Sequence, residues 1–174
     1  YGMNALEAAI IGLLIVIPQP AAKTIMPDMP DRSAECLALN MYHEARGQGI
    51  AGELAVTAVV LNRVNDKRYP NTICEVVEQG PTRVSQKSPN VTYPIKNKCQ
   101  FSWYCDGKSD IPTNKKIYNR MLTLAKAILS DKFHFVDITE GATHYHANYV
   151  LPYWAKTKTK TVVIQDHIFY RWEK

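Results

Sequence analysis

YHEARGQ (residues 42–48) and the apolar run LAVTAVVLNRV (54–64) decide how this chain folds. Ahead of them, apolar residues recur at helical spacing and predict a helix over 32–46, namely Ala34, Leu37, Ala38 and Met41. Glu44 lies three residues after Met41 and therefore belongs to the same apolar stripe. Gly47 can adopt a positive φ and is expected to end the helix. The pattern thus predicts a carboxyl group on the inward side of a helix, in its last turn.

Two effects at this position disfavour the ionised form of Glu44. Removal from water raises the pKa of a carboxyl group, and so does the negative end of the helix dipole. A carboxyl group that keeps its proton near neutral pH can act as a general acid. A glutamate at a helix end also commonly faces solvent or pairs with a nearby arginine, here Arg46, so position alone leaves both interpretations open.

A second helix is predicted over 51–65, and its residues are apolar on nearly every side. A helix of this kind is a central, buried one, against which the Glu44 helix packs. Glu53 lies at its start, where the helix dipole stabilises a carboxylate, so Glu53 is a poorer candidate acid than Glu44.

Length and charge narrow the class of protein without fixing it. The 174 residues suffice for one domain with its own core. The net charge of +5 suits a polyanion, whether nucleic acid or the phosphate- and carboxylate-rich bacterial envelope. No nucleic-acid motif of defined spacing is present, so no nucleic-acid partner is expected, and the lysines of 156–160 are interpreted as a solvated loop or strand edge.

Four cysteines permit three pairings: Cys36, Cys74, Cys99 and Cys105. Their spacing matches no zinc ribbon, and an even count behind an export-like N-terminus favours disulfides in an oxidising compartment. We expect Cys99 to pair with Cys105 across a short loop, which leaves Cys36 with Cys74. The alternative is a set of buried free thiols.

The N-terminal part divides from the rest by composition. Residues 5–17 are apolar apart from one glutamate, too short to cross a bilayer as a helix but as long as a signal-peptide core. They are expected to be a signal-like or anchor-like segment, able to associate transiently with a membrane. The four prolines of 18–31 indicate a linker, so the predicted division is 1–31 and a catalytic domain over 32–174.

The remaining chain predicts an α+β domain. Residues 66–113 hold five prolines and little periodicity, apart from a short helix near 72–79, and are interpreted as a binding-loop region. A third helix is expected over 114–130, followed by strands over 143–147, 161–164 and 167–171. Helices followed by a small antiparallel sheet are typical of this class.

Five segments in this order resemble the cell wall hydrolase family typified by the catalytic domain of the spore-cortex-lytic enzyme SleB. They are YHEARGQGIAGELAVTAVVLNRV (42–64), YPNTICEVV (69–77), CQFSWYCDG (99–107), GATHYHA (141–147) and HIFYR (167–171). The resemblance covers 32–172 and implies a lysozyme-like fold and cleavage of peptidoglycan glycan strands next to N-acetylmuramic acid. It implies lytic transglycosylase chemistry, with the first glutamate of the E-A-R-G-E motif, Glu44 here, as the catalytic acid. The second glutamate of that motif is Gln48 in this chain, which excludes a second carboxylate at that position.

The residue types agree with that chemistry. A two-carboxylate glycosidase needs a second Asp or Glu near the acid, and Asp106 is the best candidate in the matched motifs. A transglycosylase needs one group, which protonates the glycosidic oxygen and then, as carboxylate, deprotonates the muramic C6 hydroxyl. Substrate binding is predicted for Gln100, Phe101, Ser102, His144, Tyr145 and Asn148. Phe101, Trp103 and Trp154 offer rings for pyranose stacking, with core packing as the alternative.

Two other functions stay open at this point. His144 and His146 share one face of a strand and, with a carboxylate, would suit a zinc amidase of the stem peptide, but the helix lacks His-Glu-x-x-His. No metal or other cofactor is therefore expected. Gln48 also keeps a wall-binding or virion protein without activity in consideration. The expected location is the cell envelope, periplasm or exterior, as an exported enzyme, phage endolysin or virion-associated lysin.

Overall fold

The computed structural model describes residues 30–132 and 134–173. The apolar segment 5–17 and nearly all of the linker 18–31 lie outside the described residues. The predicted helices are present with small shifts of their ends: α1 (Pro30–Ala45), α2 (Gly49–Val64), α3 (Ile73–Val77) and α4 (Lys115–Ile128). Asn114 caps α4 by accepting a hydrogen bond from the backbone N–H of Ile117.

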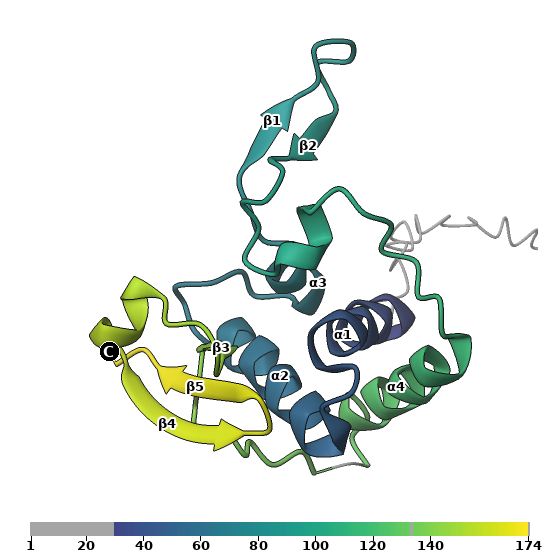
Figure 1. Cartoon of the computed structure of the whole chain (residues 1–174). Coiled ribbons are helices and arrows are strands. Elements are labelled where there is room, and N and C mark those ends of the chain that lie inside the picture. The colour runs from purple at the N-terminus through teal and green to yellow at the C-terminus, as the bar shows by residue number, and fades with distance from the viewer. Residues whose placement is uncertain (1–29, 133, 174) are drawn as a thin grey trace, which may run out of the picture.

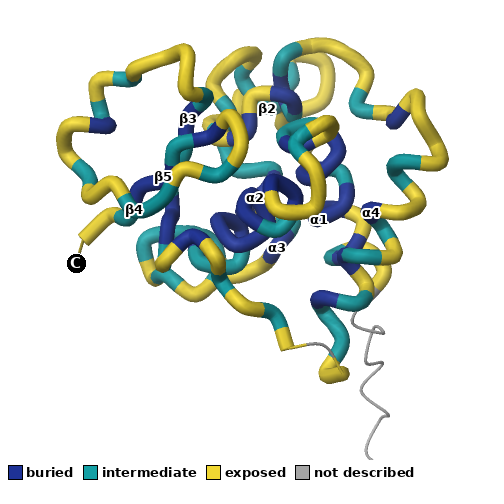
Figure 2. The backbone as a smooth tube through the Cα atoms, turned by 60° about the horizontal axis from the view of Figure 1, so that its bottom comes forward, coloured by how far each residue is buried: buried dark blue, intermediate teal, exposed yellow. Residues whose placement is uncertain are grey.

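α1 and α2 form the centre of the molecule, with α4 and α3 packed against α1 (Figure 1). The buried residues of these helices make one continuous apolar core, to which Leu37, Met41, Val56, Val60, Val76 and Met121 contribute. Figure 2 shows the darkest, most buried tube along α1 and α2. The prediction of a helix that is buried all round is thus confirmed for α2.

Glycines make the tight connection between α1 and α2. Gly47 and Gly49 adopt φ of +95° and +67°, which side chains other than glycine rarely tolerate. A Cβ on Gly52 would lie only 2.4 Å from the Cβ of Gln48, so the first turn of α2 also depends on a missing side chain. The connection places the last turn of α1 beside the body of α2.

A three-stranded antiparallel sheet covers the other side of α2 (Figure 1). It consists of β3 (His144–Ala147), β4 (Thr159–Ile164) and β5 (His167–Arg171), in the order β3-β5-β4. Tyr145 of β3 pairs with Phe169 of β5, and Phe169 is fully buried against Ala55 and Val59 of α2. The predicted α+β class is therefore confirmed.

The loop region contains structure that the sequence did not predict. β1 (Thr82–Val84) and β2 (Thr92–Pro94) form a hairpin that stands away from the body (Figure 1). Two short 3₁₀ helices follow, η1 (Ser102–Cys105) and η2 (Tyr153–Thr157). Five of the six hairpin strand residues are exposed, so neither strand has the alternation of buried and exposed residues that marks a strand in a sequence.

Both expected disulfides are present. Cys36 of α1 is bonded to Cys74 of α3, and Cys99 is bonded to Cys105 across the η1 segment. The four cysteines of the chain are thereby all oxidised, which excludes the alternative of free thiols. Within 30–132 and 134–173, no helix is long and apolar enough to cross a bilayer.

Candidate active site

Glu44 occupies the predicted position in the last turn of α1, half-buried and three residues before Gly47. The sheet brings a partner to it from 101 residues further along the chain: the hydroxyl of Tyr145 donates a hydrogen bond to Glu44 Oε2, 2.5 Å away. Tyr145 faces α2 because it lies on the same side of the sheet as the buried Phe169. The predicted acid and one predicted binding residue are therefore in direct contact.

Burial raises the pKa of Glu44 above its ordinary value. The hydrogen bond from Tyr145 and the positive charges of His43 and Arg63 act in the opposite direction without cancelling that effect. The carboxyl group therefore keeps its proton to a higher pH than a glutamate in water does. It can give up a proton, and Tyr145 and Arg63 stabilise the carboxylate that remains.

Arg63 is a member of the site that the sequence analysis missed. Its side chain is buried, its Nε donates to the carbonyl of Thr143 at 2.8 Å, and its guanidinium lies over the rings of Tyr69 and Phe101 at 5.3 and 5.1 Å. Its Nη1 has no hydrogen-bond partner among the described residues. The available signal was an arginine within the otherwise apolar run of α2, where a charge must have partners to be tolerated.

His43, the residue before Glu44, is held in place by stacking against Trp103. Their rings stack at 4.6 Å, and Trp103 Nε1 donates to Asn40 Oδ1 at 3.1 Å. His43 Nε2 is hydrogen-bonded to the backbone carbonyl of Asp110 at 3.0 Å. Since Trp103 is also buried, this ring fixes the imidazole and does not offer an open face to a sugar.

The predicted sugar-binding residues of the η1 segment divide into two groups. Phe101 is buried in the main core beneath Arg63, so it supports the site from below. Gln100 and Ser102 are exposed on either side of it. The bond between Cys99 and Cys105 closes this short loop and constrains both exposed side chains.

His144 and His146 lie on the face of β3 opposite to Tyr145, as strand alternation requires. The ring of Trp154 packs against both, 5.2 Å from His144 and 5.7 Å from His146. Burial together with the nearby charges of Arg63, Lys158 and Arg68 lowers the pKa of His144 to about 3, so this imidazole is neutral at physiological pH. His144 is thereby separated from the Glu44 side of the strand.

The two histidines are committed to neighbouring protein groups. His144 Nδ1 is hydrogen-bonded to Thr143 Oγ1, and both nitrogens of His146 are bonded, one to the Ala147 carbonyl and one to the Tyr170 hydroxyl. No group of three His, Cys, Asp or Glu side chains is arranged to hold a metal ion in the part of the chain that the structure describes. The donor set for a zinc amidase is therefore not assembled around this pair.

Gln48, the departure from the family motif, ties the α1–α2 connection to the sheet. Its Nε2 donates to Asp166 Oδ2 at 3.0 Å, and its Oε1 accepts from the backbone N–H of Asp166 at 3.1 Å. The carbonyl of Asp166 in turn accepts from the backbone N–H of Asn148 at 2.7 Å. Asn148, an exposed predicted binding residue, is thus linked through Asp166 to Gln48, four residues after Glu44.

Neither of the other carboxylates considered from sequence contacts Glu44. Glu53 is buried in α2 and is paired through both oxygens with Arg120 of α4, at 2.5 and 2.8 Å. Asp106 Oδ1 accepts from the backbone N–H of Lys108 at 2.7 Å and so stabilises its own loop. Within the described residues, the charged groups that act on Glu44 are His43 and Arg63.

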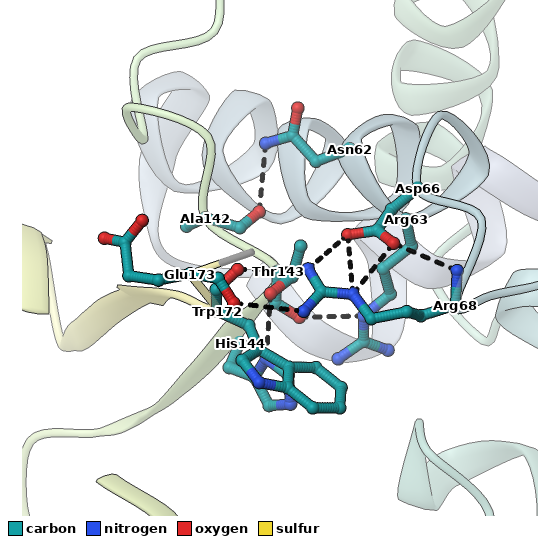
Figure 3. A network of polar contacts seen from close by, with 9 residues as sticks. All are labelled: Asn62, Arg63, Asp66, Arg68, Ala142, Thr143, His144, Trp172 and Glu173. Atoms are coloured by element: carbon teal, nitrogen blue, oxygen red, sulfur yellow. Dashed lines mark hydrogen bonds and ion pairs between the residues drawn. The ribbon is translucent and has the colours of Figure 1, made fainter. Parts of the chain in front are cut away.

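A cavity of about 980 Å³ lies at the C-terminal end of α2, and Glu44 is not among its lining residues. Its walls are joined to one another: Arg68 binds Asp66 through two nitrogens and also donates to the carbonyl of Trp172 (Figure 3). Arg68 stacks over the ring of Trp172 at 4.2 Å, and Asn62 donates to the carbonyl of Ala142. This network fixes the end of α2, from which Arg63 extends, to the C-terminal residues (Figure 3).

Curated relatives of the chain are spore cortex-lytic enzymes. That of Halalkalibacterium halodurans is 38% identical over 140 residues, which is 80% of this chain and 34% of that enzyme. That of Bacillus cereus is 26% identical over 153 residues, which is 87% of this chain and 49% of that enzyme. The chain thus spans about half the length, or less, of the curated relatives it matches.

Two solved structures share its fold. The catalytic domain of the Bacillus cereus SleB protein superposes with a TM-score of 0.54 at 23% identity, over 87% of this chain and 100% of that one. The catalytic domain of the germination-specific lytic transglycosylase SleB from Bacillus anthracis gives 0.53 at 23% identity, over 88% and 100%. These likenesses confirm the expected lysozyme-like fold, a helical core with a small antiparallel sheet.

A sequence profile described as Cell Wall Hydrolase matches residues 47–170, beginning three residues after Glu44. The matched part contains α2, the η1 segment and the three-stranded sheet except for Arg171, the last residue of β5. Because the match covers well over half of its residues, this chain belongs to the Cell Wall Hydrolase family.

Proposed function

We propose that this protein cleaves the glycan strands of peptidoglycan next to N-acetylmuramic acid, as a lytic transglycosylase with Glu44 as the acid and base. The observation that carries the proposal is the environment of Glu44: one half-buried carboxyl group with a raised pKa, a hydroxyl donor on Oε2 and no second carboxylate acting on it among the described residues. A single group of this kind suffices for a reaction that excludes water.

The reaction follows from the two states of Glu44. Protonated Glu44 gives its proton to the glycosidic oxygen as the bond to the muramic C1 breaks, so the leaving sugar departs as an alcohol. Tyr145 and the charge of Arg63 stabilise the resulting carboxylate of Glu44. This carboxylate then accepts the proton of the muramic C6 hydroxyl, while the C6 oxygen attacks C1. An anhydro ring forms and Glu44 is again protonated.

Exposed polar groups in the segments that flank the site support the binding of a sugar chain. Gln100, Ser102 and Asn148 are exposed, and Tyr145 is fixed by its bond to the acid. The stable pairing of all four cysteines supports action in an oxidising place, the periplasm or the cell exterior. A transient contact of residues 5–17 with a membrane remains part of this proposal.

Mass spectrometry of digested peptidoglycan tests the proposal. The parent protein is expected to release anhydro-muramic products, whereas Glu44→Gln, which keeps the size of the side chain, is expected to release at least 10³-fold less, because no other group supplies the proton. Asp106→Asn is the matched control and is expected to act like the parent.

Each other outcome selects a different reaction. Reducing-end sugars from the parent, with loss of activity in Asp106→Asn, would establish a two-carboxylate hydrolase. Free stem peptides, abolished by chelators, would establish the metal-dependent amidase. Binding to the wall without release of any fragment by the folded parent protein would establish the inactive wall-binding protein.

A further inference from the structure

The segment between β3 and β4 exposes an unusual run of apolar side chains. Tyr149, Leu151 and Tyr153 are 83%, 73% and 88% exposed, the highest values of any large hydrophobic residue in the described chain, and Val150 between them is 47% exposed. Figure 2 shows this segment as a mostly yellow loop that projects between β3 and β4. Adjacent exposed apolar residues of this size mark a binding surface more often than a solvated loop.

The loop backbone is held at both ends of the apolar run, which limits the positions that the exposed side chains can take. The backbone N–H of Val150 donates to the carbonyl of Ala147, and that of Ala155 donates to Pro152, both at 3.1 Å. Ala155 is buried, and the neighbouring Trp154 packs against the rings of His144, His146 and Tyr170. A preformed surface loses less conformational entropy on binding than a flexible one.

Lysines follow the apolar run directly. Lys156 and Lys160 are exposed, while Lys158 lies over the rings of Trp154 and Trp172 at 5.9 and 4.6 Å. None of the three forms a salt bridge with a residue that the structure describes. The surface therefore combines aromatic rings with positive charge and would favour a ligand with apolar faces and acidic groups.

The position of the loop relative to Glu44 points to the substrate. The loop starts after Asn148, whose backbone is bonded to Asp166, and Asp166 is bonded to Gln48 beside the last turn of α1. Asn148 lies three residues after Tyr145, about 10 Å along an extended strand. Because Trp154 packs on the face of β3 opposite to Tyr145, the loop lies around the end of the strand from Glu44, where a more distant stretch of the same long polymer would bind.

We infer that residues 149–160 form an auxiliary binding surface for the peptidoglycan strand. The rings of Tyr149 and Tyr153 contact the apolar faces of sugar rings, and Lys156 and Lys160 pair with carboxylates of the stem peptides. The surface acts in binding and takes no part in proton transfer. This inference rests on the proposed function, because it takes the same polymer as the ligand.

Cosedimentation with insoluble peptidoglycan, measured in the inactive Glu44→Gln background, tests the inference. Replacement of both Tyr149 and Tyr153 by serine is expected to weaken binding at least 10-fold. Replacement of Lys156 and Lys160 by glutamine is expected to weaken binding at low salt and to reduce its dependence on salt. The matched control replaces Val84 and Tyr93, which are 59% and 50% exposed on the β1–β2 hairpin, by serine, and is expected to bind like the background protein.

Three results would overturn the inference. The first is unchanged binding of the tyrosine variant. The second is an equal loss in the hairpin control, which would show that any exposed apolar pair contributes. The third is a tyrosine variant that no longer binds anionic phospholipid vesicles but still binds peptidoglycan fully, which would assign the loop to a lipid surface. Failure of the proposed function has a different sign: the Glu44→Gln variant would still release fragments from peptidoglycan.

Discussion

At the scale of single residues, the hydroxyl of Tyr145 controls the proton affinity of Glu44. Its hydrogen bond stabilises the carboxylate and lowers the pKa that burial raises, so Tyr145→Phe should raise the pKa of Glu44 further. Because the acid must be protonated, the alkaline limb of the activity profile should move to higher pH. Turnover at the optimum should fall about 10-fold, since the carboxylate loses the donor that stabilises and orients it.

The measurement is the rate of turbidity loss of a peptidoglycan suspension between pH 4 and 9. Tyr170→Phe is the control, because Tyr170 bonds His146 on the opposite face of the sheet. That variant should leave the alkaline limb in place. A limb that moves to lower pH in Tyr145→Phe would refute the assignment of Glu44 as the acid.

Gln48 gives a second prediction at this scale. A carboxylate at position 48 could accept from the backbone of Asp166 but would face the carboxylate of that residue at hydrogen-bond distance. Gln48→Glu should therefore lower the melting temperature at pH 7 by roughly 2–4 °C. Addition of Asp166→Asn should restore the midpoint at pH 7, and a failure to restore it would exclude charge repulsion as the cause.

The sequence predicts the position of Glu44 better than its surroundings. Helical spacing and Gly47 determine where Glu44 lies, and both are local properties of the chain. Burial of Arg63 depends on Phe101 and Thr143, which the fold brings in from distant positions, as well as on the nearby Tyr69. The same holds for Gln48, whose partner is 118 residues away. Pairings of this kind leave no periodicity that a single sequence can reveal.

At the scale of elements, periodicity determines what can be predicted. α2 and the sheet strands carry strong apolar patterns, and their predicted bounds are within two residues of the observed ones. β1 and β2 have no buried face, because the hairpin stands off the body, and their residues are therefore indistinguishable from a loop in sequence. A hairpin stabilised mainly by its own backbone pairing was thus not predicted.

An ion pair joins α4 to a buried carboxylate in the apolar helix α2. Arg120 pairs with Glu53, whose side chain is 2% exposed, so Arg120→Ala leaves a buried carboxylate without its partner. We expect a loss of about 2–4 kcal/mol in the free energy of unfolding, at the lower end for such a change because half of Arg120 remains in water. Urea denaturation at pH 7 measures the loss.

A surface pair supplies the control for this prediction. Arg32 and Glu78 form an ion pair whose side chains are 58% and 33% exposed. Arg32→Ala should change stability by well under 1 kcal/mol, because water and ions screen the attraction. If Arg120→Ala and Arg32→Ala lowered the free energy of unfolding equally, the helix dipole alone, and not Arg120, would stabilise the buried carboxylate of Glu53 in α2.

At the scale of the whole molecule, the two disulfides constrain different features, one the fold and the other the proposed binding segment. The bond between Cys36 and Cys74 joins α1 to α3 and closes 38 residues, whereas the bond between Cys99 and Cys105 closes 6. The first therefore constrains the unfolded chain more than the second. The second encloses Gln100 and Ser102, the exposed residues on either side of Phe101, which packs beneath Arg63, and so constrains the proposed binding segment more than the fold.

Paired alanine substitutions should accordingly separate stability from activity. Cys36→Ala with Cys74→Ala is expected to lower the free energy of unfolding by about 4 kcal/mol, and Cys99→Ala with Cys105→Ala by about 2 kcal/mol, from the loop lengths in a chain-entropy account. Guanidinium denaturation measures both. Release of fragments from peptidoglycan, measured well below either midpoint, should fall more in the second pair, because Gln100 and Ser102 lose their fixed positions. If activity instead followed stability in both pairs, the short loop would have no role in binding the glycan strand beyond its share in folding.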